Sequence, residues 1–140
     1  MTQLVLKTIT TAVSALTSAP LQTGGVAPQA LTIQCNFTYG SGGTSADAWV
    51  QTSLDGGTTW VDIANFHFTT SSLRAIYNLV AITPVATQYT ATDGSLTANT
   101  AKDGILGSLY RVKYTTVGTY AGGTTLQVDA YPHAARLTSQ

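Results

Sequence analysis

Between Leu31 and Tyr39 the chain alternates without a break between apolar and polar side chains. Leu31, Ile33, Cys35, Phe37 and Tyr39 form one set, and Thr, Gln, Asn and Thr stand between them. Because successive side chains of a strand point to opposite faces, this period of two predicts a half-buried β-strand. Cys35 falls on the apolar face, where we expect it to pack as a small core residue rather than to react as an exposed thiol.

Further stretches of the same kind are separated by residues that favour turns. We expect strands over residues 46–53, 59–69, 73–80, 109–117 and 124–131. Glycine-rich connections lie at 40–45, 54–58 and 118–123, and glycine supplies the positive φ that tight hairpins need. Seven or eight short strands with turns between them predict an antiparallel β-sandwich of the jelly-roll or Ig-like kind.

The composition agrees with an all-β fold. Thr supplies 26 of the 140 residues, and its branched side chain favours a pleated strand over a helix. The chain contains no Glu and few of the other strong helix formers, so we expect no significant helix. The length is that of a single domain.

The two ends of the chain differ from the middle. Residues 1–28 begin with strand-like spacing at Leu4 and Leu6 and continue into a stretch of small residues. This segment is either an edge strand with a loop or an arm that docks on a neighbouring molecule. We expect the single sandwich domain to occupy residues 29–135 and a tail to follow at 136–140.

One internal segment, residues 85–107, loses the alternation and contains few large apolar side chains. A loop of this length in a compact domain is usually functional or flexible, so we interpret it as a contact loop. The candidate interface residues are Leu4, Leu6, Tyr89 and Leu96.

The charges exclude several classes of partner. Six basic and six acidic residues give a formal charge of zero, and the basic ones are scattered, whereas phosphate backbones require clustered Lys and Arg. We therefore expect no direct contact with nucleic acid. No apolar run approaches the ~20 residues of a membrane span, and the N-terminus lacks the pattern of a signal peptide. A single cysteine cannot form an internal disulfide. We expect synthesis in a cytoplasm and no membrane partner.

Residues capable of catalysis or metal binding are few. His67 and His133 are the only histidines, and no cluster of metal ligands accompanies them. We expect His67 to point outward or to be satisfied by a neighbour. Three aspartates precede glycine in turns, whereas Asp47, Asp62 and Asp129 lie in or beside strands and are expected to face solvent. No phosphate loop or nucleophile elbow is present. The sequence predicts neither an enzyme nor a bound metal or cofactor.

The most specific motif is Ser53-Leu-Asp55-Gly-Gly57-Thr-Thr59-Trp60, which fits the Asp-box pattern Ser-x-Asp-x-Gly-x-Thr-Trp. It resembles hairpin turns of sialidases and related propellers, where the box is a folding device away from the catalytic pocket. Asp55 is expected to accept hydrogen bonds from turn amides while Trp60 is buried over the hairpin. One box cannot make a propeller, which needs several blades, so we interpret the motif as structural.

Three longer stretches resemble small structural proteins of tailed bacteriophages and prophages. They are Ala30-Leu-Thr-Ile-Gln-Cys-Asn-Phe-Thr-Tyr-Gly-Ser-Gly-Gly-Thr-Ser45, Ala48-Trp-Val-Gln-Thr-Ser-Leu-Asp-Gly-Gly-Thr-Thr-Trp60 and Leu109-Tyr-Arg-Val-Lys-Tyr-Thr-Thr-Val-Gly-Thr-Tyr-Ala-Gly-Gly-Thr-Thr-Leu126. The resemblance implies a non-enzymatic β-sandwich component of the virion. The favoured role is capsid decoration, with the major capsid protein, other virion proteins and further copies of the chain as partners.

Two alternatives remain open at this point. Within the virion, the chain could instead belong to the tail or neck. In a different class, a glycan-binding β-sandwich module would use aromatic side chains that cannot all fit one core face, together with scattered Asp, Asn and Gln. The aromatic residues in question are Trp49, Tyr77, Tyr89, Tyr120 and Tyr131.

Overall fold

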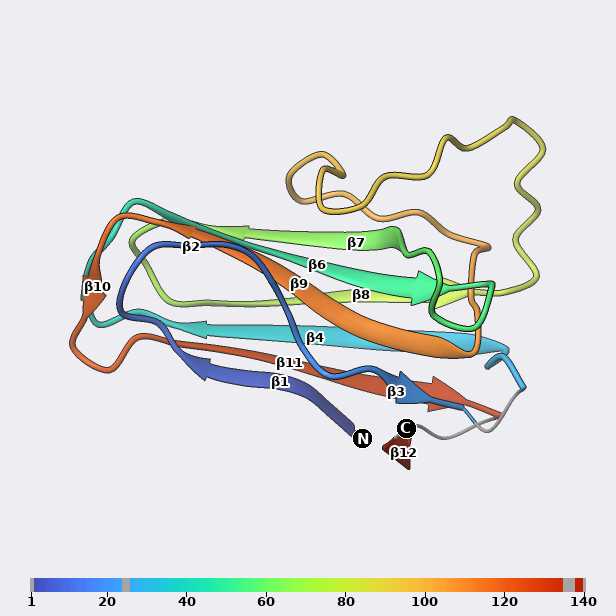
Figure 1. Cartoon of the computed structure of the whole chain (residues 1–140), viewed down its shortest axis with the longest axis horizontal. Coiled ribbons are helices and arrows are strands. Elements are labelled where there is room, and N and C mark those ends of the chain that lie inside the picture. Colours follow the sequence, from blue (N-terminus) through green and yellow to red (C-terminus); the bar gives the residue numbers. More distant parts are fainter. Residues whose placement is uncertain (1, 24–25, 135–137, 140) are drawn as a thin grey trace.

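The computed structural model describes residues 2–23, 26–134 and 138–139. Their regular structure consists of eight strands of five or more residues and four two-residue strands, all paired antiparallel. The described residues form no helix, and hence none that could cross a membrane. The strands are arranged as two packed layers (Figure 1). The expected all-β antiparallel sandwich is confirmed.

The first layer is a four-stranded sheet with β4 in its interior. In spatial order its strands are β1 (Thr2–Thr8), β11 (Thr125–His133), β4 (Ala30–Thr38) and β8 (Leu73–Val80). The alternation along β4 is confirmed, because Leu31, Ile33, Cys35 and Phe37 are all fully buried while the residues between them are partly exposed. The polar outer face of this sheet is therefore set by the period-two pattern of the sequence.

The second layer is a larger sheet built around β9. Its strands in order are β12 (Thr138–Ser139), β3 (Leu21–Gln22), β9 (Leu109–Val117), β6 (Ser45–Ser53) and β7 (Val61–Phe68), and β2 (Val13–Thr17) also pairs with β9. A β-bulge interrupts the β6–β7 register between Val50 and Gln51. As a result, both Ile63 and Ala64 are buried, and Asp62 lies opposite Gln51.

Aromatic rings fill the end of the core near the short strands β5 (Ser41–Gly42) and β10 (Tyr120–Ala121), which pair with each other. The Phe37 ring stacks on Phe68 with centroids 4.8 Å apart, and its edge meets Tyr120 at 5.8 Å. Gly43 has a φ of +69°, and a Cβ at this position would overlap the Tyr120 ring. Glycine is therefore required here for both backbone conformation and close packing.

The N-terminal segment is part of the sandwich in this structure. β1 pairs with β11, whereas β2 and β3 pair with β9 in the other sheet. Leu4, Val5 and Ile9 are buried in the core. The described part of residues 1–28 is therefore folded onto the sandwich of its own chain and does not extend from it as an arm. The expected tail at 136–140 lies largely outside the described residues.

Candidate functional site: the long loop and its polar anchors

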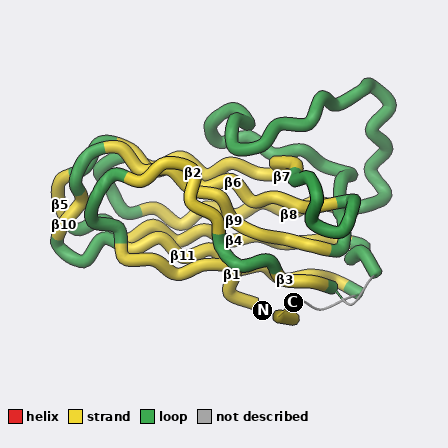
Figure 2. Tube along the Cα trace, viewed as in Figure 1, coloured by secondary structure: helices red, strands yellow, loops and turns green. Residues whose placement is uncertain are grey.

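Residues 81–108 connect β8 to β9 through a loop in which Ala101 forms an isolated β-bridge with Ala64. Figures 1 and 2 show this loop passing beyond one end of the sandwich and returning along β7. It contains the segment 85–107 for which the sequence predicted a contact loop. Its conformation is fixed by contacts with β6, β7 and β9, described next.

The backbone of the loop covers the outer edge of β7. The Asp62 and Asn65 amides donate to the carbonyls of Thr92 and Thr100, each at 2.8 Å, and the Lys102 amide donates to the Ile63 carbonyl at 2.8 Å. An uncovered edge strand would present these groups to any passing chain. The loop therefore completes the sheet as well as extending from it.

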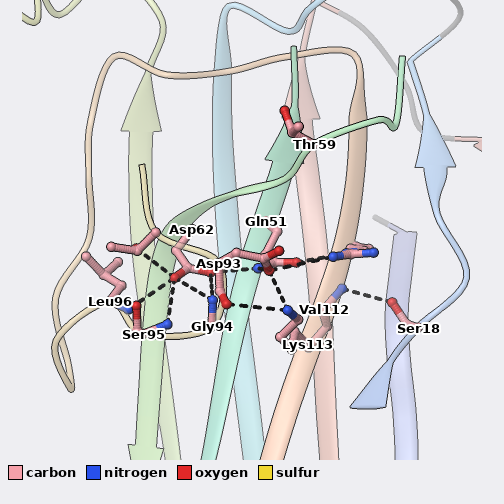
Figure 3. Close-up of polar contacts among 12 residues, drawn as sticks. Ser18, Gln51, Thr59, Asp62, Asp93, Gly94, Ser95, Leu96, Val112 and Lys113 are labelled. Atoms are coloured by element: carbon pink, nitrogen blue, oxygen red, sulfur yellow. Dashed lines mark hydrogen bonds and ion pairs between the residues drawn. The ribbon is translucent and has the colours of Figure 1, made fainter. Parts of the chain in front are cut away.

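The strongest side-chain anchor is the carboxylate of Asp62, which is fully buried and whose polar contacts are drawn in Figure 3. Its Oδ2 accepts hydrogen bonds from the Thr92 hydroxyl and from the amides of Gly94, Ser95 and Leu96, at 2.8–3.1 Å. The expectation that Asp62 faces solvent is wrong. The outward side of β7 is covered by a segment that lies about thirty residues further along the chain, and no local pattern reveals such a cover.

A row of charged and amide side chains continues this anchor across β6 and β9. The Gln51 Nε2 donates to Asp62 at 2.8 Å and to Asp93 at 2.6 Å, and the Arg111 Nε donates to the Gln51 Oε1 at 2.8 Å. The Lys113 ammonium forms an ion pair with Asp93. Although partial burial opposes ionisation, the hydrogen bonds from Lys113 and Gln51 outweigh it and hold the pKa of Asp93 below its ordinary value.

Further anchors hold both ends of the loop. The Asn99 amide donates to the Asn65 Oδ1 at 2.9 Å, and the His67 amide donates to the Asn99 Oδ1 at 3.0 Å. Toward the end of the loop, the Asp103 carboxylate bonds to its start, accepting from the Val80 amide at 2.6 Å and from the Thr83 hydroxyl at 2.9 Å. The bond from the Val80 amide is the main reason why the pKa of Asp103 lies below its ordinary value.

The Asp-box residues lie together in the β6–β7 hairpin as the motif predicts. The Asp55 carboxylate accepts from the Thr59 amide at 2.8 Å and from the Thr59 hydroxyl at 2.6 Å, and the Ser53 hydroxyl accepts from the Gly57 amide at 2.9 Å. The bond from the Thr59 hydroxyl contributes most to lowering the pKa of Asp55. Trp60 is only half-buried, and the Arg111 guanidinium lies 4.3 Å from the centroid of its ring.

A hollow of about 590 Å³ separates this hairpin from the long loop. Its lining is mostly apolar and consists of Leu54, Thr59, Trp60, Val61, Val85, Gln88, Tyr89, Ala91 and Ile105. Leu54 and Val85 at its margin are 69% and 46% exposed. The end of the sandwich thus carries an apolar depression whose two walls are held in place by Asp55 on one side and by Asp62 on the other.

The structure places the four candidate interface residues differently. Leu4 and Leu96 are buried within the chain, so we no longer count them as contact residues. Tyr89 is half-buried, and its hydroxyl donates to the Asp62 carbonyl at 3.0 Å. Leu6 is 51% exposed on β1 and remains available. The sequence did not identify Asp62 and Gln51 as residues that hold the loop. The one weak sign of this role is the run Thr-Asp-Gly-Ser at 92–95, whose amides and hydroxyls can donate hydrogen bonds to a buried acceptor.

The polar side chains that anchor the loop fix its position on the sandwich. The carboxylates of Asp62 and Asp93 are occupied by donors from the protein itself. His67 is satisfied by Asp47, with 2.9 Å between Nδ1 and Oδ1. Within the described ranges, no three His, Cys, Asp or Glu side chains are grouped so that they could hold a metal ion. The anchors position a surface.

Comparison with protein-family models finds no match for the chain, and comparisons with curated proteins and with solved structures find none either.

Proposed function

We propose that the protein is a non-enzymatic structural component of a tailed-phage virion and that it decorates the capsid by binding the major capsid protein. The three sequence blocks that resemble such proteins supply β4, most of β6, and β9, the strands at the centre of both sheets. The resemblance thus involves the framework of the fold rather than one turn.

The observation that carries the proposal is the apolar depression between the hairpin and the long loop. Exposed apolar side chains around a hollow are typical of surfaces that contact another protein. Leu54 and Val85 border this one, and Trp60 and Tyr89 line it. Because Asp62 and Asp55 already fix both walls, docking a neighbour here would cost little ordering entropy. An apolar side chain of the shell would fill the hollow.

The proposal is tested by adding the full-length chain to undecorated capsids of the phage or prophage that encodes it, followed by sedimentation and quantification of the bound protein. We expect a copy number close to that of the major capsid protein. A Leu54→Asp/Val85→Asp variant should remain folded, because both residues are exposed, and should lose occupancy. Ile76→Asp is the matched control, since Ile76 is 57% exposed on the other sheet.

A small fixed number of copies per virion would contradict decoration and support a tail or neck position. Absence of the chain from purified virions would refute the virion assignment altogether. Equal occupancy of the double variant and wild type would remove the depression as the contact surface, and exposed Leu6 on β1 would become the next residue to test.

A further inference from the structure

The outer face of the four-stranded sheet carries a second hollow, lined mostly by residues whose side chains contain polar groups. Register places Asp129 of β11 opposite Gln34 of β4, and Tyr131 opposite Thr32. A space of about 310 Å³ lies over these strands, lined by Thr32, Gln34, Asp129, Ala130, Tyr131 and His133. The side chains that line it offer a carboxylate, an amide, two hydroxyls, an imidazole and an aromatic ring.

Asp129 is the unusual member of this group. The sequence predicted that it faces solvent, which is wrong, because it is only 4% exposed. Its Oδ2 accepts a hydrogen bond from the Gln127 Nε2 at 3.0 Å, whereas its Oδ1 is buried and accepts none from any residue that the structure describes. A buried acceptor without a donor is costly, so Asp129 gains if its side chain turns toward the hollow that it lines, where an O–H or N–H group of a ligand can reach Oδ1.

Tyr131 supplies an exposed aromatic surface beside that carboxylate. The residue is 52% exposed, and its ring meets the His133 ring with centroids 5.3 Å apart. His133 Nε2 lies 3.5 Å from the Thr32 Oγ1. His133 also borders an adjoining hollow of about 470 Å³, lined by Gln29, Ala30, Asn78, Val80, Ile82 and His133. The two hollows together extend across β11, β4 and β8.

We infer that this face binds a neutral carbohydrate. A sugar presents hydroxyl donors to a carboxylate and to amide oxygens, and it presents C–H groups to the face of an aromatic ring. Among the described residues, the linings of both hollows include no Lys or Arg to compensate the charge of an acidic sugar beside Asp129. The site lies on the opposite sheet from the depression proposed to bind the shell, and it therefore adds a second function that does not depend on the first.

Saturation-transfer NMR on the full-length chain tests the inference with lactose, maltose, cellobiose and N,N′-diacetylchitobiose as probes, each at about 10 mM, because unoptimised sites of this size bind in the millimolar range. Sialyllactose serves as the acidic counterpart of lactose. We expect transfer to at least one neutral sugar, weaker transfer to sialyllactose, and amide shift changes confined to residues around Thr32, Gln34 and Tyr131.

Three variants locate the binding. Tyr131→Ala should weaken association with the responding sugar by about tenfold or more, the loss of one good contact, whereas Tyr131→Phe should bind like wild type. Asp129→Asn should also weaken it, since the amide presents a donor where the sugar hydroxyl needs an acceptor. Val117→Ala, similarly exposed but on the other sheet, is the control and should leave binding unchanged.

The inference is overturned if none of the sugars receives saturation, if shift changes fall elsewhere, or if Tyr131→Ala binds like wild type. Loss of capsid occupancy in Tyr131→Ala, without any sugar binding by wild type, would assign the face to a protein contact instead. Because sugar binding and capsid sedimentation are measured separately, failure of one proposal is distinguishable from failure of the other.

Discussion

Replacing Asp62 by Asn should release the long loop from the sandwich, and the size of the effect follows from the donors that surround the carboxylate. Oδ2 accepts one hydroxyl and three backbone amides, and Oδ1 accepts the Gln51 amide group and the Gly94 amide. An asparagine can keep an oxygen at only one of these positions. The least costly orientation keeps Oδ2, and with it the Gly94 amide, but it sacrifices the Gln51 donor on Oδ1 and removes the charge that strengthens the other bonds.

Hydrogen bonds to a charged group contribute about 1.5–3 kcal/mol each, and their losses are not additive. We therefore expect Asp62→Asn to lower the free energy of unfolding by about 2–3 kcal/mol, a large part of the roughly 5–15 kcal/mol that holds an ordinary domain together. With a urea m-value of about 1–3 kcal/mol/M, the midpoint should fall by about 1 M or more.

The assay combines urea unfolding followed by circular dichroism with hydrogen exchange of individual amides. In the wild type, the Gly94, Ser95 and Leu96 amides should be protected, and in the variant they should exchange much faster. Asp93→Asn is the matched control, because the Asp93 side chain is 50% exposed and its ion pairs with Lys113 and Arg111 should contribute less than about 1 kcal/mol. An unchanged midpoint with unchanged protection in Asp62→Asn would refute the role of the carboxylate as the loop's anchor.

Three further outcomes follow from the fold. Deleting residues 1–28 should abolish cooperative thermal unfolding, since the core then loses Leu4, Val5 and Ile9, each of which contributes roughly 2 kcal/mol by its burial. A truncated chain that still melts cooperatively would support the alternative that this segment is a docking arm. The pKa of Asp55 is lowered from its ordinary 3.8, so the stabilising contribution of its carboxylate is complete above pH 3.8 and disappears as the pH falls through the folded-state pKa. The stabilities of wild type and Asp55→Asn, measured by unfolding at a series of pH values, should therefore differ at neutral pH and converge below the folded-state pKa. Burial raises the pKa of the Cys35 thiol far above its ordinary value, so a thiol-specific reagent should label it only at the rate of unfolding, and rapid labelling of the native chain would contradict its place in the core.

The parts of the fold that could be predicted from the sequence are those with a local signature. The alternation from Leu31 to Phe37 predicted both the strand and its buried face, because a period of two is fixed by strand geometry itself. The Asp-box predicted the contacts of Asp55 because all its partners lie within a few residues. The burial of Asp62 depends on a segment distant in sequence. For both Asp62 and Asp129, a position on the outer side of a strand gave the usual expectation of solvent exposure, which was wrong.

The N-terminal segment shows a different limit. Spacing at Leu4 and Leu6 indicated a strand, yet a bulge between Gln3 and Val5 turns both Leu4 and Val5 inward and leaves Leu6 outside. One extra residue shifts the inward-facing set by one position, and the sequence carries no mark of where that residue is inserted. Residues 1–28 fold onto their own chain because β11 offers a free edge with which β1 can pair. The pattern of residues 1–28 does not reveal that edge.

Because the chain's own loop covers β7, this edge is closed to pairing with other copies of the protein at high local concentration. Of the lateral edges of the two layers, those of the four-stranded sheet are β1 and β8, and each displays an exposed cation, Lys7 on one and Arg74 on the other. Charged side chains on an edge strand oppose its pairing with another chain, whether β1 meets β1, β8 meets β8 or β1 meets β8. A protein with no net charge gains little protection against association from charge repulsion. Lys7 and Arg74, together with the loop that covers β7, would oppose the pairing of these edges between densely packed copies.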